Sequence, residues 1–406
     1  MEKAYLVERI KTHLHVLCNK IGERRVGSEK NRLATDYAGK ILKEYGWQTE
    51  ANKLSVIDWK TEGAELTCGD KSFEVFSSHY SLGCSVKGEL IAIDTIDKLE
   101  QSNITDKIVL LYGDISSQQI APKKFPFWNP EEHQHLISVL ERNRPLAIIT
   151  ATKRDSALAG GVYPFPMFED GDFDIPSVYM TDIVGEKLLK CKGETVELVS
   201  KAKRIPEIAY NIIGNNSTEN SNRIVITAHI DTKIDTPGAI DNGTGVAVLL
   251  VLAEILKDCS IKHPIELVVF NGEDYYGAPG QVEYVKQNLG KFSDILLNIN
   301  IDGAGYHEGF SCFSPFNLPE NVSTAFKDML SDNPLIIEGL PWYQGDHSLF
   351  LQNRTPAIAV SSNWFIENME SQEITHTPKD NLGIVNFERV AECAIGVRDL
   401  IRKIGS

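Results

Sequence analysis

Short apolar runs alternate with helical patterns in the C-terminal half of the chain. The clearest runs, which we predict to be β-strands, are residues 224–228, 265–270, 296–301 and 357–360. Residues 242–256 are apolar nearly all round, which is typical of a helix packed into the centre of a layered domain. This alternation begins at about residue 199, and it predicts a mostly parallel sheet with helices on both faces.

The N-terminal half divides into two kinds of pattern. Residues 2–18 and 29–45 have helical spacing, and we expect a strand to follow through about residue 58. From about residue 60 the pattern changes to short β-like runs broken by proline and aromatic turns. We therefore predict one α/β domain formed by residues 1–59 and 199–406, with a β-rich domain inserted at residues 60–198.

Composition and charge narrow the possible classes of function. The 406 residues are 42% hydrophobic and 24% charged, which argues against a disordered or fibrous chain. The formal net charge of -15, without a concentrated basic run, disfavours a nucleic-acid partner. No apolar run stands out as a membrane span, so we expect no membrane partner.

The cysteines and the N-terminus bear on the cellular compartment. Seven scattered cysteines without a C-x-x-C pair predict neither a disulfide framework nor a cysteine zinc site, and they favour a reducing compartment. The first six residues lack the apolar core of a signal peptide. We expect a cytoplasmic protein, or a secreted one if a leader has been removed, and no pattern indicates the oligomeric state.

Imidazole and carboxylate side chains recur where the predicted strands end. Four of these residues end or closely follow strands, one precedes the central helix, and one lies in the loop after the last strand. Sites in open α/β sheets form at the carboxyl ends of the strands, so these side chains should converge in one crevice. The six candidates are His229, Asp241, Glu273, Asp274, Asp302 and His376.

This mixture of side chains suits a metal centre. Zn²⁺ is the best match, and Mn²⁺ or Co²⁺ is chemically admissible. Five ligands exceed the three protein ligands and one water of a typical catalytic zinc, so we expect two ions that share a carboxylate. Two ions about 3.5–4 Å apart can activate a water and polarise a carbonyl. Glu273 would then be the general base that moves the proton from this water to a leaving amine.

The motifs that carry these residues resemble those of a known family. They are His229-x-Asp231, Asp241-Asn242-Gly243, Gly272-Glu273-Asp274, Ile301-Asp302-Gly303, Gly345-Asp346-His347 and His376-Thr377-Pro378 with Asp380. Their order and spacing are similar to those of the dinuclear zinc aminopeptidases, metallopeptidase family 28, which also includes glutamate carboxypeptidase and the non-enzymatic transferrin receptor. The resemblance covers the N-terminal helices and the chain after about residue 200. Residues 174–181 resemble the protease-associated domain that many members carry as an insertion.

The resemblance implies a zinc-exopeptidase (phosphorylase/hydrolase-like) fold and a division of the ligands between two zinc ions. His229 and Asp302 would hold one ion. Asp274 and His376 would hold the other, and Asp241 would bridge both.

The resemblance also implies roles for two carboxylates that bind no metal. At two positions, this chain differs from the residue that is common in the family. Glu273 matches the family's general base, and Asp231 would orient His229 through its other ring nitrogen. The second-metal carboxylate is commonly Glu in this family and is Asp274 here. Many members have a Tyr, which can stabilise an oxyanion, where this chain has Thr375.

We therefore predict a metal-dependent aminopeptidase that hydrolyses the first peptide bond of short peptides. The alternatives are a carboxypeptidase, a glutaminyl cyclase-like enzyme, or a receptor on the same fold. A receptor is expected to lack metal ligands, and this chain keeps all five. The cyclase uses one zinc, so the intact His229-x-Asp231 motif argues against it. A carboxypeptidase needs a cationic clamp for the substrate carboxylate, which no pattern locates. We expect Asp346 to cap the helix after it, with His347 structural.

Overall fold

The computed structural model describes residues 2–155, 158–217, 219, 222–257 and 261–404, and it divides the chain into two compact units. The first unit is formed by the chain up to Val56 and from Ile208 onward. The inserted unit is Ile57–Glu207, where the sequence analysis places residues 60–198. The boundaries between the units lie within β1 (Gln48–Cys68) and β8 (Thr195–Asn215). The resemblance of the inserted unit to a protease-associated domain stays a prediction.

The first unit is built on a mostly parallel sheet, as predicted. Its strand order is β13-β12-β14-β11-β9-β10-β8. The four central strands are parallel, and antiparallel pairs occur at β8 with β10 and at β12 with β14. The strands other than β8 are β9 (Arg223–His229), β10 (Ile265–Phe270), β11 (Ile295–Ile301), β12 (Ser311–Phe316), β13 (Ile336–Glu338) and β14 (Ala357–Ser362).

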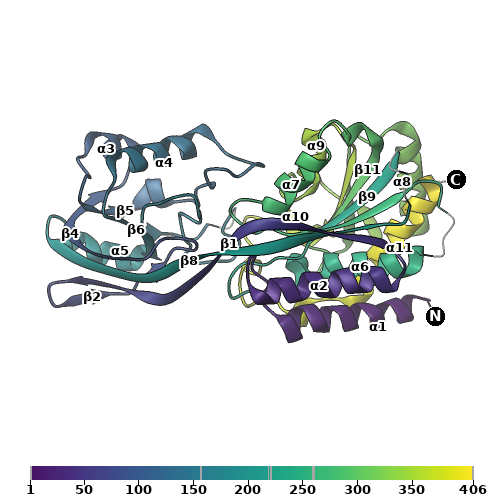
Figure 1. Cartoon of the computed structure of the whole chain (residues 1–406), viewed down its shortest axis with the longest axis horizontal. Helices are drawn as coiled ribbons and strands as arrows, with labels where there is room; N and C mark the ends of the chain where they lie inside the picture. Colours follow the sequence, from purple (N-terminus) through teal and green to yellow (C-terminus); the bar gives the residue numbers. More distant parts are fainter. Residues whose placement is uncertain (1, 156–157, 218, 220–221, 258–260, 405–406) are drawn as a thin grey trace. The chain divides into compact units, whose positions relative to one another are not determined.

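Helices cover both faces of this sheet. In Figure 1, α1, α2 and α6 lie on one side of β9 and β11, and α7 and α9 lie on the other. The predicted helix at residues 2–18 is an α-helix followed by a π-helical turn, η1 (His15–Ile21). The helices are α1 (Glu2–Leu14), α2 (Glu29–Glu44), α6 (Thr244–Leu256), α7 (Pro279–Gln287), α8 (Glu320–Asp332), α9 (His347–Gln352), α10 (Asn363–Glu367) and α11 (Phe387–Ile404).

The helix α6 forms the centre of the hydrophobic core. It packs against α1, α2 and α11 and against the sheet, and its side chains from Val246 to Ala253 are buried. The segment Ala239–Leu256, which includes the π-helical turn η4 (Ala239–Gly243), is long and apolar enough to cross a membrane, although the sequence analysis singled out no such run. Because 89% of it is buried inside the protein, its composition is explained by core packing.

The inserted unit has its own sheet and its own hydrophobic clusters. Its strand order is β8-β4-β5-β6-β7-β3, in which β4 to β7 are parallel, and β1 forms a hairpin with β2. Its strands besides β1 and β8 are β2 (Lys71–Phe73), β3 (Phe76–Ser77), β4 (Cys84–Ile93), β5 (Ile108–Leu111), β6 (Ala147–Thr152) and β7 (Ser177–Thr181). Its α-helices are α3 (Ile96–Gln101), α4 (Glu131–Asn143) and α5 (Asp182–Leu188).

A buried arginine fixes the loop between β9 and α6. Arg24 is fully buried, and its guanidinium donates hydrogen bonds to the carbonyl oxygens of Ile230, Pro237 and Gly238 at 2.7–2.9 Å. Its own backbone N–H donates to the hydroxyl of Thr232 at 2.8 Å. Buried backbone carbonyls require such partners, so Arg24 holds the loop in one conformation.

Replacement of Arg24 by Met should destabilise the first unit. At least three buried carbonyls would lose their donor, and each unsatisfied group costs about 1–3 kcal/mol, so we expect the free energy of unfolding to fall by at least about 3 kcal/mol. Urea unfolding followed by circular dichroism measures this change. The control is Lys40→Met, because the Lys40 side chain is 73% exposed on α2. A loss below about 1 kcal/mol in the Arg24 variant would contradict this interpretation.

Candidate metal centre

The polar candidates gather at one edge of the first unit's sheet. The strands β9, β10 and β11 are parallel, so their carboxyl ends lie at the same edge. His229 is the last residue of β9 and pairs with the last residue of β10, Phe270. Asp274 lies four residues beyond β10, and Asp302 directly follows β11. The structure thus brings together the strand-end residues that the sequence analysis singled out.

Asp241 lies between two imidazole rings. Its Oδ1 is 3.1 Å from Nε2 of His229, and its Oδ2 is 3.3 Å from Nε2 of His376. Nε2 of His229 is also 3.7 Å from Oδ2 of Asp302, and Nε2 of His376 is also 3.0 Å from Oδ1 of Asp274. The arrangement has two halves that share Asp241. We call them the His229 half (His229 and Asp302) and the His376 half (His376 and Asp274).

The donor atoms of this cluster fit a metal ion. Both ring nitrogens of His229 and Oδ2 of Asp274 are buried, and among the described residues they have no partner in hydrogen-bond geometry. Buried polar atoms rarely stay unpaired in proteins, so a set of atoms of this kind indicates a further partner. His229, Asp241 and Asp274 each offer an atom within 4.8 Å of the others. Imidazole nitrogen and carboxylate oxygen are ligands that Zn²⁺ accepts.

The electrostatics of the cluster also favour a cation. Burial lowers the pKa of His229, but the neighbouring carboxylates, Asp302 first among them, raise it well above its usual value. The pKa of His376 is raised in the same way, chiefly by Asp274 and against burial. Burial raises the pKa of Asp241, but the two imidazoles outweigh it and hold this pKa well below its usual range. Carboxylates outnumber imidazoles, so the centre attracts positive charge.

Asp231 holds the loop that carries two of the candidates. Its Oδ1 accepts a hydrogen bond from the backbone N–H of Gly272 at 2.7 Å, and its Oδ2 accepts one from that of Asp274 at 3.0 Å. Its Oδ1 is 3.6 Å from Nδ1 of His229, which is too long for a strong hydrogen bond. Asp231 therefore touches both the histidine and the loop after β10, and the second contact was missed from sequence.

Glu273 lies in the loop that Asp231 holds. Its backbone N–H is 3.3 Å from Oδ1 of Asp231, and its side chain is half-buried beside the cluster. Burial raises the pKa of Glu273 well above its usual value, and the carboxylates of Asp274 and Asp302 raise it further, while His229 lowers it. A carboxyl group beside such a cluster can accept and return a proton.

Asp380 organises the loop of Asp241 from the other side, a role that the sequence analysis did not assign. Its carboxylate accepts hydrogen bonds from the backbone N–H groups of Ala239, Ile240 and Asp241 at 2.7–3.1 Å. Asp380 is fully buried, and burial, followed by the charge of Asp241, raises its pKa to about 7. The sequence signal was its place four residues after His376, in a motif already compared with the family.

Asp346 does not make the predicted cap. It occupies the N-cap position of α9, but no side-chain capping hydrogen bond forms there among the described residues. The amide of Gln281 donates instead to its Oδ1 at 2.8 Å, and burial raises the pKa of Asp346 to about 7. Nε2 of His347 is 2.8 Å from the carbonyl oxygen of Trp342, and burial lowers the pKa of His347 to about 4.

Thr375 has a partner within its own loop. The side-chain amide of Gln372 donates to its hydroxyl at 2.6 Å and accepts from its backbone N–H at 3.0 Å. The next residue, His376, has a φ of 64°, in the left-handed region that few non-glycine residues adopt. The Gln372–Thr375 contacts support this backbone conformation, which turns His376 toward Asp241.

Comparisons with known proteins agree with this geometry. The sequence pattern described as Peptidase family M28 matches residues 211–401. The probable lipoprotein aminopeptidase LpqL of Mycobacterium tuberculosis is 26% identical over 294 residues, which are 69% of this chain and 55% of that protein. Aminopeptidase YwaD of Bacillus subtilis is 24% identical over 56% of this chain and 51% of its own length. The chain thus spans about half the length of the curated relatives it matches.

Solved structures share the fold over nearly the whole chain. An aminopeptidase from Aneurinibacillus sp. strain AM-1 has a TM-score of 0.75 at 18% identity and covers 98% of this chain and 92% of its own. BSAP, a zinc aminopeptidase from Bacillus subtilis, also has a TM-score of 0.75 at 18% identity, with 97% and 94% covered. All the candidate ligands lie within residues 211–401, the segment of this chain that matches peptidase family M28.

Proposed function

We propose that this chain is a metal-dependent aminopeptidase. The observation that carries the proposal is the position of Asp241, whose two carboxylate oxygens each face a different imidazole at 3.1 and 3.3 Å. One carboxylate shared between two imidazole–carboxylate halves is the arrangement that a pair of adjacent cations requires. The match of residues 211–401 to the M28 family and the aminopeptidase names of the relatives support the same activity.

The proposed metal is zinc, two ions per centre, with Mn²⁺ or Co²⁺ as chemically admissible substitutes. The name of the Bacillus subtilis neighbour, a zinc aminopeptidase, supports this choice. His229 and Asp302 would hold one ion, His376 and Asp274 the other, and Asp241 would contact both. Zinc held there would polarise the carbonyl of the substrate and make a bound water more acidic.

The protein's own residues would supply positioning and proton transfer. Glu273 would take the proton from the attacking water at its carboxylate and return it to the leaving amine. Asp231 would keep Glu273 in place, because it accepts from the backbone N–H groups of the loop on either side of it. Asp380 would do the same for Asp241 through three backbone N–H groups.

Charge favours an amino-terminal substrate over a carboxyl-terminal one. Besides Asp380, six carboxylates lie in or beside the centre, and two divalent cations would leave an excess of negative charge in the ionised state. This charge attracts the protonated amino group of a peptide and repels its terminal carboxylate. The six are Asp231, Asp241, Glu273, Asp274, Asp302 and Asp346. The carboxypeptidase, cyclase and receptor alternatives have no comparable support.

The activity itself is testable with matched peptides. We expect the protein to release the N-terminal residue from peptides with a free amino group and to leave their N-acetylated counterparts intact, because acetylation removes the positive charge. Chelation should abolish the reaction, and addition of Zn²⁺, Mn²⁺ or Co²⁺ should restore it. Mass spectrometry of the products measures the outcome. Release of C-terminal residues, or equal cleavage of acetylated peptides, would contradict the proposal.

Replacement of Glu273 by Gln tests the proposed base. The amide keeps the shape of the side chain but cannot accept the proton, so kcat should fall by about 10²–10⁴-fold while metal content stays unchanged. Steady-state kinetics and elemental analysis measure the two quantities. Glu308→Gln is the control, because the Glu308 side chain is 56% exposed. Unchanged turnover in the Glu273 variant would show that another group is the base.

Replacement of Asp241 by Asn tests the shared ligand. The variant should bind at least one metal ion fewer per chain than the wild type, because an amide offers one neutral oxygen where the carboxylate offers two charged ones. Inductively coupled plasma mass spectrometry of dialysed protein gives the ratio. Asp235→Asn is the matched control, since Asp235 is exposed in the same loop. Equal metal content in wild type and Asp241 variant rules out the bridging role.

A further inference from the structure

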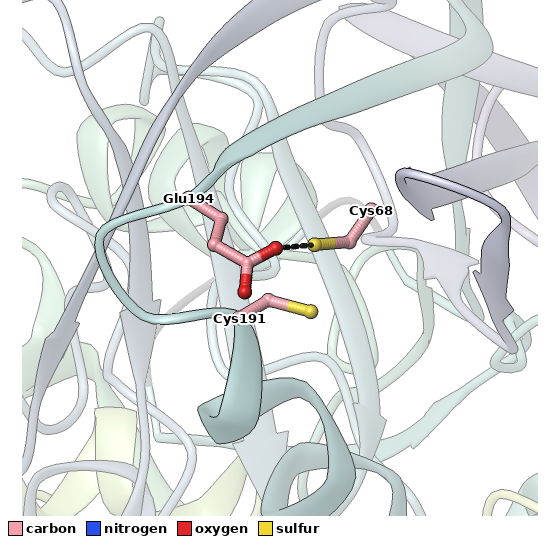
Figure 2. Close-up of side chains that lie close together, drawn as sticks. All are labelled: Cys68, Cys191 and Glu194. Carbon is pink, nitrogen blue, oxygen red and sulfur yellow. Dashed lines mark hydrogen bonds between the residues drawn. The ribbon is translucent and has the colours of Figure 1, made fainter.

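Three potential metal ligands come together in the inserted unit, apart from the metal centre of the first unit. They are Cys68 at the end of β1, Cys191 at the end of the short helix η3 (Leu189–Cys191), and Glu194 just before β8. Figure 2 shows their side chains gathered in one place. The two sulfur atoms and a carboxylate oxygen all lie within 4.8 Å of one another. The thiol of Cys68 donates to Oε2 of Glu194 at 3.2 Å.

A tight turn holds two of these side chains on the same side. The backbone N–H of Glu194 donates to the carbonyl oxygen of Cys191 at 2.9 Å. Between them, Lys192 has φ −57° and ψ 128°, and Gly193 has a φ of 80°, which together describe a type II turn with glycine where a positive φ is required. The first and fourth residues of such a turn lie close together, so the side chains of Cys191 and Glu194 can reach the same atom.

Neighbouring strands fix this turn and the third side chain. The N–H of Gly193 donates to the carbonyl oxygen of Leu90, and the N–H of Leu90 donates to that of Glu194, both at 2.9 Å. Cys68 ends its strand opposite Lys71, at the closed end of the hairpin of β1 and β2. All three backbones are therefore held by hydrogen bonds, and the side chains meet without a long flexible loop.

The two sulfur atoms of this cluster are buried, whereas its carboxylate lies at the protein surface. Cys68 is 2% exposed and Cys191 is fully buried, and both belong to the hydrophobic cluster of this unit. Glu194 is exposed, yet its carboxylate turns inward to the thiol of Cys68. The carboxylate thus lies between solvent and the sulfur atoms, which leaves a path by which an ion can enter.

We propose that Cys68, Cys191 and Glu194 form a separate site for a thiophilic divalent cation, with Zn²⁺ as the biological choice. Two thiolates select zinc over Mg²⁺, Ca²⁺ or Mn²⁺, which prefer oxygen ligands. Zinc accepts sulfur and carboxylate oxygen in one tetrahedron, and three protein ligands leave the fourth position to water. The ion would tie the end of the β1–β2 hairpin to the turn before β8. The sequence analysis found no cysteine zinc site because the two cysteines lie 123 positions apart in the sequence.

The absorption spectrum of the full chain with added Co²⁺ distinguishes this site from the centre at the sheet edge. Cobalt bound to thiolate shows a strong sulfur-to-metal charge-transfer absorption in the near ultraviolet, and the other centre offers only nitrogen and oxygen donors. We expect the wild type, kept reduced with a phosphine, to develop this band, with an intensity at saturation that corresponds to one thiolate-bound ion per chain. Zn²⁺ should then displace the cobalt and bleach the band.

Single substitutions assign the band to its ligands. Cys191→Ser should abolish it, and Glu194→Gln should weaken cobalt binding at least tenfold while the thiolate band persists at higher Co²⁺. Because Glu194 is exposed, its substitution tests the site even if the buried cysteine variant fails to fold. The matched control is Cys84→Ser, in the same unit and outside the cluster, which should leave the band unchanged.

Three results would overturn the proposal. They are the absence of the band in reduced wild-type protein at saturating Co²⁺, an unchanged band in folded Cys191→Ser, and unchanged cobalt affinity in Glu194→Gln. If the reduced protein gives no band and the protein before reduction has two fewer titratable thiols, the two cysteines are a disulfide-forming pair. Peptide hydrolysis plays no part in these measurements, so failure of the proposed aminopeptidase activity would leave them unaffected.

Discussion

The loop between β9 and α6 can hold Asp241 only because its backbone polar groups are satisfied inside the protein. Arg24 donates to carbonyl oxygens on the N-terminal side of the loop, and Asp380 accepts from the amides that end at Asp241. Both side chains are fully buried, and one comes from the N-terminal segment while the other comes from near the end of the chain. Loss of either would leave buried polar groups unpaired, at a cost comparable to a large part of a domain's stability.

The same edge of the sheet gathers like charges that repel one another. Asp231 and Asp380 are used to hold backbone amides, and they lie beside Asp241 and Asp274, which face the imidazoles. Burial and the neighbouring charge of Asp241 raise the pKa of Asp274, so the ionised form is disfavoured when no cation is near. A bound cation would offset this repulsion. The carboxylates that hold the loops therefore add to the negative charge that would attract a cation.

The strands and the central helix could be predicted because their signals are local. The run 265–270 coincides with β10, and the apolar segment 242–256 contains α6, which begins at Thr244. The convergence of His229, Asp274 and Asp302 followed from parallel strands ending at one edge. These features depend on hydrophobic spacing within a few residues or on a general rule for sheets.

The supporting contacts could not be predicted, because each joins segments far apart in the sequence. Nothing near Arg24 indicates that its guanidinium reaches carbonyls more than 200 residues away, and Asp380 gives no local sign that it accepts from the loop of Asp241. The position of Asp346 alone predicted that it caps α9. Instead, its carboxylate accepts a hydrogen bond from the side-chain amide of Gln281 on another helix. The cluster of Cys68 with Cys191 likewise depends on a hairpin and a turn that meet only in the fold.

The two halves around Asp241 differ in mechanical stiffness. His229 ends a strand bonded to neighbours on both sides, and the N–H of Asp302 is bonded to the carbonyl of Val360, so moving either residue stretches the sheet. His376 and Asp274 belong to loops, which have no such ladder, and single side chains hold them: Asp231 accepts from the N–H of Asp274, and Gln372 accepts from that of Thr375. The His229 half is thus anchored by the sheet, whereas the His376 half depends on a few side-chain contacts. A substitution at one of these side chains would shift the His376 half and leave the His229 half in place.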